Sequence, residues 1–176
     1  MKKSNKNVLV GVTASIAAYK SCDIIRSLKK SGYDTKVVIS PDAKEFITPL
    51  TLQTISCNEV VTDMFKVSEK WDIYHTSLAE WADVILVAPA TADIISKLAC
   101  GLADCALSAV VLASKADVLI APAMNENMYK NRITQDNIKK LKSLGYKFVE
   151  PIKGRLACGK VGVGCLAEVE TIIKEV

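Results

Sequence analysis

The sequence has few aromatic residues, little net charge and no long apolar run. Aromatic side chains make up 6% of the 176 residues, which is too few for a surface on which nucleic-acid bases stack. The formal net charge is only +4, and beyond residues 1–7 the lysines are spread along the chain, so nucleic-acid binding is not indicated. The longest apolar runs, 84–90 and 118–124, are far shorter than the roughly 20 residues that cross a bilayer. We therefore expect neither a nucleic-acid partner nor a membrane span.

Histidine is nearly absent, and the cysteines form no metal-binding pattern. The six cysteines include no C-x-x-C pair, and a single histidine, His75, adds little capacity to hold a metal, so we expect no metal site. Residues 1–7 lead straight into a strand-like run without the small-residue cleavage site of a signal peptide. We therefore expect a cytoplasmic chain with free thiols. Four thiols lie in apolar or helical contexts and are expected in the core: Cys22, Cys57, Cys100 and Cys105.

Short apolar runs alternate with helical segments along a chain of one-domain length. The runs typical of buried strands are residues 8–12, 35–39, 84–88, 118–121 and 146–149. The main helical segments are residues 15–31, 42–56 with an interruption at Pro49, 134–144 and 168–176. This alternation predicts a single α/β domain over residues 1–176, a parallel flavodoxin-like or Rossmann-like sheet with helices on both faces.

Two details of this interpretation depend on local composition. The first helical segment has apolar residues, Ile16 and Tyr19 among them, that fall mostly on one side and are expected to face the core. The glycine-rich residues 150–165 are expected to form a flexible loop.

Ligands of parallel α/β sheets bind beyond the carboxyl ends of the strands. Polar or conformationally unusual residues stand at four of the expected ends: Thr13 and Ser15, Ser40, residues 89–93 and residues 122–125. The sequence therefore predicts one cleft at this edge of the sheet.

Residues 11–16, Gly-Val-Thr-Ala-Ser-Ile, join the first expected strand to the first helix. Free backbone N–H groups at a helix start, together with the Ser15 hydroxyl, suit a phosphate. Gly11 lacks partner glycines at the G-x-G-x-x-G spacing and no G-K-[ST] follows, so neither the nicotinamide fingerprint nor a P-loop is present. The alternative is that Ser15 is an ordinary helix N-cap.

Residues 88–93, Ala-Pro-Ala-Thr-Ala-Asp, and residues 121–125, Ala-Pro-Ala-Met-Asn, repeat one design. A buried strand is followed by proline, small residues and a polar residue, which allows a flat ligand to approach the backbone closely. Two turns of nearly the same sequence favour a shared ligand. The alternative is that Asp93 and Asn125 simply cap the helices that follow.

Two further side chains have suitable chemistry. His75 lies near an expected helix start and could act as a general base, although a lone histidine is more often structural or exposed. Cys158 lies in the glycine-rich segment near Arg155 and Lys160, where a thiol is accessible. The alternative for this segment is a mobile surface loop without a catalytic role.

Together these segments resemble the flavin-dependent cysteine decarboxylase family over roughly residues 7–168. The resemblance rests on residues 11–18, His75, residues 88–93, residues 122–129 (Pro-Ala-Met-Asn-Glu-Asn-Met-Tyr) and Ala157-Cys158-Gly159 with Gly162 and Gly164. Two positions depart from the family pattern: relatives often have asparagine at Asp93 and tryptophan at Tyr129.

The resemblance implies FMN as the cofactor. It places Ser15 at the phosphate and residues 91–93 at the isoalloxazine ring, and the residues around FMN would be Ser15, Ile16, Ser40, Phe46, Thr91, Ala92 and Asp93. It also implies a homotrimer or a dodecamer with flavin at the subunit contacts.

The implied reaction is decarboxylation of 4′-phospho-N-pantothenoylcysteine to 4′-phosphopantetheine in coenzyme A synthesis. FMN would oxidise the thiol to a thioaldehyde, whose C=S group accepts the electrons left by carbon dioxide, and reduced flavin would then return the resulting enethiol to the thiol. His75 would assist proton movement, Asn125 would hold the substrate carboxylate with Met128 alongside, and Cys158 would give a proton to the enethiol.

The resemblance leaves three alternatives. Family members that oxidatively decarboxylate the C-terminal cysteine of a peptide lack the Cys158 thiol. A flavin-binding regulatory subunit would carry an acidic tail, which residues 168–176 do not form. Flavin prenyltransferases share the fold but not the Pro-Ala-Met-Asn and Ala-Cys-Gly strings.

Bacterial relatives are often fused to the ligase that joins cysteine to phosphopantothenate, so a separate or fused ligase is an expected partner.

Overall fold

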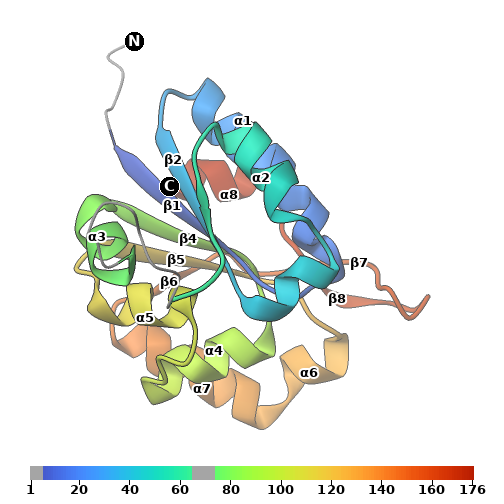
Figure 1. The fold of residues 1–176 in the computed structure, drawn as a ribbon. Helices are drawn as coiled ribbons and strands as arrows, with labels where there is room; N and C mark the ends of the chain where they lie inside the picture. The colour runs from blue at the N-terminus through green and yellow to red at the C-terminus, as the bar shows by residue number, and fades with distance from the viewer. Residues whose placement is uncertain (1–5, 65–73) are drawn as a thin grey trace.

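Six parallel strands form the central sheet of the computed structural model, which describes residues 6–64 and 74–176 (Figure 1). In chain order they are β1 Asn7–Val12, β2 Asp34–Ile39, β3 Val60–Val61, β4 Val84–Ala90, β5 Asp117–Pro122 and β6 Lys147–Phe148. Their order across the sheet is β3-β2-β1-β4-β5-β6, which is the order of the Rossmann fold. Strand order reverses between β1 and β4, and the crevice at this switch point is where such folds bind ligands.

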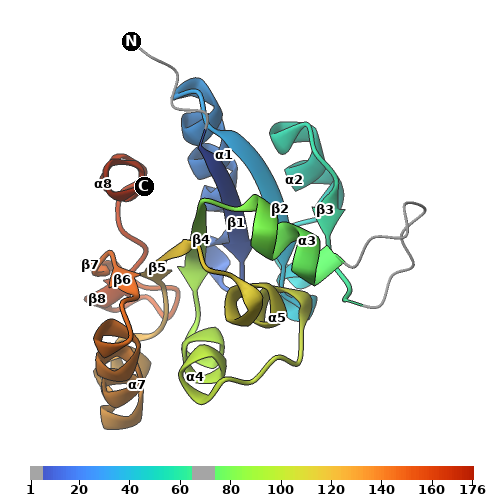
Figure 2. The ribbon, with the colours of Figure 1, turned by 90° about the vertical axis from the view of Figure 1, so that its left-hand side faces the viewer.

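Helical elements cover both faces of the sheet. They are η1 Ile16–Lys20, α1 Ser21–Lys30, η2 Pro41–Glu45, α2 Pro49–Ser56, α3 Tyr74–Trp81, α4 Ala92–Cys100, α5 Ala106–Ala113, α6 Glu126–Lys130, α7 Arg132–Ser143 and α8 Val169–Glu175. Side chains of α1, α2 and α8 form one buried core with the sheet, and those of α3, α4, α5 and α7 form a second. The two cores lie on opposite faces (Figure 2), because successive strand residues such as Leu9 and Val10 belong to different cores.

The expected α/β sheet with helices on both faces is confirmed. Each of the five expected strands is present, with ends within two residues of those predicted, and α2 begins at Pro49 as a helix whose first turn tolerates proline. No helix within residues 6–64 and 74–176 combines the length and apolar character that a bilayer span requires.

Three expectations about local structure are wrong. Residues 150–165 are not a loop but contain an antiparallel hairpin, β7 Ile152–Arg155 and β8 Val161–Cys165. Ile16 and Tyr19 are 63% and 60% exposed, because the first turn is a 3-10 helix that points them away from the core reached by α1. Among the expected core thiols, Cys105 is buried and Cys22 half-buried, but Cys57 and Cys100 sit at the ends of α2 and α4 and are exposed.

Candidate functional site

Thr13 joins the carboxyl ends of β1 and β4 at the switch point. Its buried hydroxyl donates to the Pro89 carbonyl oxygen at 2.7 Å and accepts from the Thr91 backbone N–H at 3.1 Å. The Ala88–Pro89 peptide bond is cis. Because one hydroxyl satisfies a donor and an acceptor of the neighbouring strand, the turn at residues 89–91 is fixed against β1.

Replacing Thr13 by valine is expected to lower the free energy of unfolding by about 1–3 kcal/mol, because a buried carbonyl and a part-buried N–H lose their partner. Urea denaturation would measure the change. Thr54→Val is the matched control, since its exposed hydroxyl donates only to Leu50 within α2, and its effect should stay within about 0.5 kcal/mol. Equal stability of Thr13→Val and the parent would refute the proposed role of Thr13.

Backbone hydrogen bonds extend this connection to β2 and β5. Ser40 N–H donates to the Val12 carbonyl at 2.9 Å, and Ala123 N–H donates to the Ala90 carbonyl at 2.9 Å. The ends of four neighbouring strands, marked by Ser40, Thr13, Thr91 and Ala123, therefore form one continuous row, which we call the carboxyl edge. It brings together the four strand ends at which the sequence predicted one cleft, whereas His75 on α3 and Cys158 on the hairpin lie outside it.

Ser15 caps η1 and lies at the carboxyl edge beyond β1. Its hydroxyl accepts from the Ala17 N–H at 3.2 Å, so Ser15 is the N-cap of η1. Ile16 and Phe46, which follow β1 and β2, are 63% and 48% exposed. Exposed apolar side chains beside small residues and a hydroxyl suit a flat ring with a phosphate tail, and therefore fit the FMN that the resemblance implies.

Thr91 and Asp93 have separate roles at the start of α4. Thr91, not Asp93, is the N-cap, because its hydroxyl accepts from the Ile94 N–H at 3.4 Å. The Asp93 carboxylate instead pairs with Lys97 at 3.1 Å, and Lys97 also pairs with Asp104 at 3.1 Å. Partial burial acts to lower the pKa of Lys97, but the hydrogen bonds to Asp104 and Asp93 raise it. Lys97 therefore remains a cation between two carboxylates one helical turn below the carboxyl edge.

Asn125 caps α6, directly after β5. Its Oδ1 accepts from the Asn127 N–H at 2.9 Å, so Asn125 is the N-cap of α6. This bond fixes which amide atom faces the helix, and the Nδ2 group has no acceptor among the residues described. Asn125 is exposed, and Met128 on the same short helix is 49% exposed. A fixed amide with free N–H groups suits the binding of a carboxylate.

Cys158 lies in the turn of the β7–β8 hairpin. Gly159 N–H donates to the Leu156 carbonyl at 2.9 Å and Leu156 N–H to the Lys160 carbonyl at 2.8 Å, which closes the turn. Gly159 has φ +83°, a conformation that favours glycine. Cys158 is exposed, and the hairpin projects from the body of the molecule (Figure 1).

The base of the hairpin packs on the turn before α6. Met124 N–H donates to the Gly164 carbonyl at 3.0 Å. A Cβ at Gly164 would overlap the Met124 carbonyl oxygen, so only glycine allows the two backbones to approach this closely. The hairpin that carries Cys158 is thus attached to the segment that carries Asn125.

His75 lies in the first turn of α3, away from the other candidates. It is half-buried, and its buried Nδ1 atom has no hydrogen-bond partner within the described ranges. Figure 1 places α3 on the opposite side of the molecule from α6 and the hairpin, and Figure 2 also shows α3 apart from the hairpin. One chain therefore does not bring His75 next to Asn125 or Cys158.

Tyr129 forms a link that sequence reasoning did not identify. Its hydroxyl donates to Glu150, whose other oxygen accepts from Lys142 at 2.6 Å. Burial and the Glu150 carboxylate raise the pKa of Tyr129 to about 12, so the phenol stays protonated as a donor. Tyr129 therefore connects α6 to Glu150, two residues before β7.

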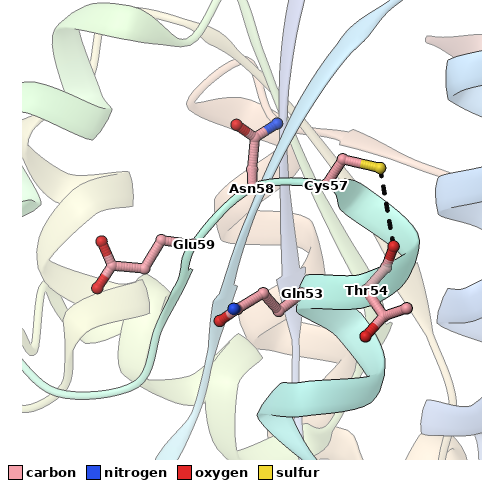
Figure 3. Close-up of a pocket in the computed structure, with 5 residues that line it drawn as sticks. All are labelled: Gln53, Thr54, Cys57, Asn58 and Glu59. Atoms are coloured by element: carbon pink, nitrogen blue, oxygen red, sulfur yellow. Dashed lines mark hydrogen bonds between the residues drawn. The ribbon is translucent and has the colours of Figure 1, made fainter.

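A depression of about 600 Å³ lies at the end of α2, lined by Gln53, Thr54, Cys57, Asn58 and Glu59 (Figure 3). The Cys57 thiol contacts the Thr54 carbonyl at 3.7 Å, and the Asn58 amide donates to the Thr35 carbonyl near the start of β2. The depression is therefore near the amino end of β2 and separate from the carboxyl edge.

Comparison with known proteins adds three findings from sequence. Residues 1–176 match the model of the family described as Flavoprotein. The chain is 48% identical over 170 residues to the "Coenzyme A biosynthesis bifunctional protein CoaBC" of Borreliella burgdorferi, covering 97% of this chain and 43% of that relative. It is 46% identical over 173 residues to the "Probable phosphopantothenoylcysteine decarboxylase" of Streptococcus mutans, covering 97% of each.

Solved structures agree with the fold. A cysteine-to-serine mutant of "PPC decarboxylase", complexed with pantothenoylaminoethenethiol, matches with a TM-score of 0.89 and 29% identity over 97% of this chain and 96% of that chain. "The FMN binding protein AtHal3" matches with a TM-score of 0.85 and 29% identity over 97% and 94%. The chain spans less than half the length of the Borreliella relative but nearly all of the Streptococcus one.

Proposed function

The chain belongs to the Flavoprotein family, and we propose that it is an FMN-dependent enzyme that decarboxylates 4′-phospho-N-pantothenoylcysteine to 4′-phosphopantetheine. The observation that carries the proposal is the match to a named phosphopantothenoylcysteine decarboxylase along 97% of both chains. The free Asn125 amide and a thiol on an attached hairpin support it, because they supply a carboxylate-binding group and a proton donor.

The carboxyl edge is the proposed flavin site. Bound FMN would take two electrons from the cysteine thiol of the substrate and later return them to the product. Ser15 would hold the phosphate at the start of η1, Ile16 and Phe46 would cover the ring, and the turn at residues 91–93 would lie against it beside Ser40. Because the Asp93 carboxylate is paired with Lys97, backbone atoms of that turn are the better candidates for ring contacts.

The side chains around the substrate would bind its carboxylate and transfer protons. The Asn125 Nδ2 group would hold the carboxylate, and Met128 would pack against the same molecule. Oxidation of the thiol to a thioaldehyde places a C=S group where it accepts the electrons released with carbon dioxide. The Nδ1 of His75, which has no hydrogen-bond partner within residues 6–64 and 74–176, would take a proton during thiol oxidation, and Cys158 would protonate the enethiol that remains.

A homo-oligomer, a trimer or a dodecamer, would complete this site. Within one chain α3 lies opposite the hairpin, so His75 of one copy would face Asn125 or Cys158 of a neighbouring copy. Exposed Ile16 and Tyr19 beside the carboxyl edge support a contact there. A phosphopantothenate–cysteine ligase, fused or separate, would supply the substrate. Six free cysteines support a cytoplasmic location.

The charge of the hairpin favours a phosphorylated substrate over a peptide. Residues 152–165 include Lys153, Arg155 and Lys160 but no carboxylate. These cations would attract the phosphate of phosphopantothenoylcysteine, whereas a cysteine-ended peptide offers only its terminal carboxylate.

The proposal is tested by giving the flavin-loaded protein two substrates at equal concentration. Phosphopantothenoylcysteine is expected to release carbon dioxide with kcat/KM at least about 100-fold above that of a peptide ending in cysteine, because the peptide lacks the phosphate and its charge-assisted contacts with the hairpin. Preference for the peptide, with an oxidised enethiol as the final product, would instead identify a peptide-modifying enzyme.

A further inference from the structure

Glu126 connects the residue that follows Asn125 to the hairpin that carries Cys158. Its Oε1 accepts from the Val163 backbone N–H at 3.3 Å and from Lys130 Nζ at 2.8 Å. Its side chain is 30% exposed, and Lys130 holds it from the other end of α6. The hydrogen bond from Lys130 and that from the Val163 N–H lower the pKa of Glu126, so the side chain is an acceptor over the working pH range.

The hairpin is shaped to receive this carboxylate. A Cβ at Gly162 would overlap Glu126 Oε2, so the carboxylate occupies the space that the side chain of any residue other than glycine would need at this position. Two positions further, Gly164 meets the Met124 backbone in the same way. β8 therefore contacts the turn at residues 124–126 through two glycines and two hydrogen bonds, of which only the Glu126 bond uses a side chain.

We propose that Glu126 is a positioning residue that fastens the β7–β8 hairpin to α6 and so sets Cys158 relative to Asn125. The catalytic consequence of this inference rests on the proposed function, whereas the attachment of the hairpin by Glu126 does not depend on it. The surrounding motif supplies Asn125 and Met128 for the substrate, and Glu126 points instead to the hairpin.

The consequence concerns the last step of the reaction. After carbon dioxide leaves, Cys158 would give a proton to one carbon of the enethiol, and bound FMN would supply the two-electron reduction that completes the saturated thiol. If Cys158 is displaced, the enethiol would leave before protonation, and in air the two electrons taken from the substrate would pass to molecular oxygen. A loosened hairpin should therefore raise the share of enethiol more than it lowers the release of carbon dioxide.

The test compares four variants of the flavin-loaded protein. Glu126→Ala removes the acceptor, and Gly162→Ala displaces the carboxylate from the hairpin side. Glu126→Gln keeps an acceptor oxygen of the same reach and should restore the parent behaviour. Asp136→Ala is the matched control, because it removes an exposed carboxylate that pairs along α7 with Arg132 and Lys139.

Hydrogen exchange in residues 161–165 is the readout that does not depend on turnover. Without substrate, we expect about tenfold faster exchange in Glu126→Ala and Gly162→Ala, because the hydrogen bond from the Val163 N–H to Glu126 is lost. Residues 132–143 of α7 serve as the internal reference. Exchange equal to the parent in both variants would overturn the fastening.

Product analysis in air then tests the positioning role. With phosphopantothenoylcysteine, the ratio of enethiol to saturated thiol should rise at least about fivefold in both variants, while carbon dioxide release falls less than about threefold, because only the proton donor is displaced. An unchanged ratio despite faster exchange would overturn the positioning role. A parent protein that leaves this substrate intact would refute the proposed function, and the exchange result would still decide whether Glu126 fastens the hairpin.

Discussion

Replacing Cys158 by serine is expected to leave carbon dioxide release within about tenfold of the parent rate and to lower formation of 4′-phosphopantetheine by about 10²–10⁴-fold. Serine preserves the size of the side chain at the exposed turn, but its hydroxyl is a far weaker acid than a thiol. The enethiol should therefore accumulate, and mass spectrometry of the products would show a species two hydrogens lighter than the saturated thiol.

The control for this substitution is Cys57→Ser. Cys57 is also exposed but lies at the end of α2, near the amino end of β2, so its replacement should change neither product nor rate. Formation of 4′-phosphopantetheine at the parent rate by Cys158→Ser would show that another group donates the proton.

Replacing Asn125 by aspartate is expected to lower kcat/KM by about 10³-fold or more. The free amide N–H group is exchanged for a carboxylate oxygen, so a charge-assisted hydrogen bond to the substrate carboxylate is lost and a like-charge contact replaces it. The fold should be unaffected, because aspartate caps helices as well as asparagine does and its oxygen can still accept from Asn127. Steady-state kinetics together with thermal unfolding would separate these effects.

Asn131→Asp is a closely matched control for that variant. Asn131 caps α7 as Asn125 caps α6, with its Oδ1 accepting from Ile133 N–H at 2.9 Å. Its substitution should leave kcat/KM within about twofold, because exposed substitutions away from the site have small effects. If both variants lose activity equally, helix capping rather than carboxylate binding is the function of Asn125.

The sheet could be predicted from the sequence because its strands are covered on both faces. β4 is buried at every position and β5 at all but Asp117, so their apolar runs are nearly continuous and distinct from the helical segments. α5 was not identified, since it is apolar on almost every side and lacks the amphipathic period of α7. β3 has only two residues and gives no periodic signal.

The carboxyl edge was predictable in outline, and the hairpin was not. Residues 89–93 and 122–125 could be identified, because the conformation of a turn before a helix itself favours proline and small residues. The glycines of β8 are required by tertiary contacts instead. Gly162 lies against Glu126 and Gly164 against the Met124 carbonyl, and these contacts form only after β5 and the hairpin have packed together. The separation of His75 from Cys158 likewise depends on where α3 packs, which no local pattern contains.

The central claim is that the electrons taken from the substrate thiol are returned to the same molecule. The direct measurement is anaerobic turnover of excess phosphopantothenoylcysteine by the flavin-loaded protein, with no added electron donor or acceptor. Many turnovers per site, equal amounts of carbon dioxide and 4′-phosphopantetheine, and a yellow protein at the end are expected. One equivalent of carbon dioxide per site followed by lasting loss of the yellow colour, or a protein that binds no flavin, would contradict it.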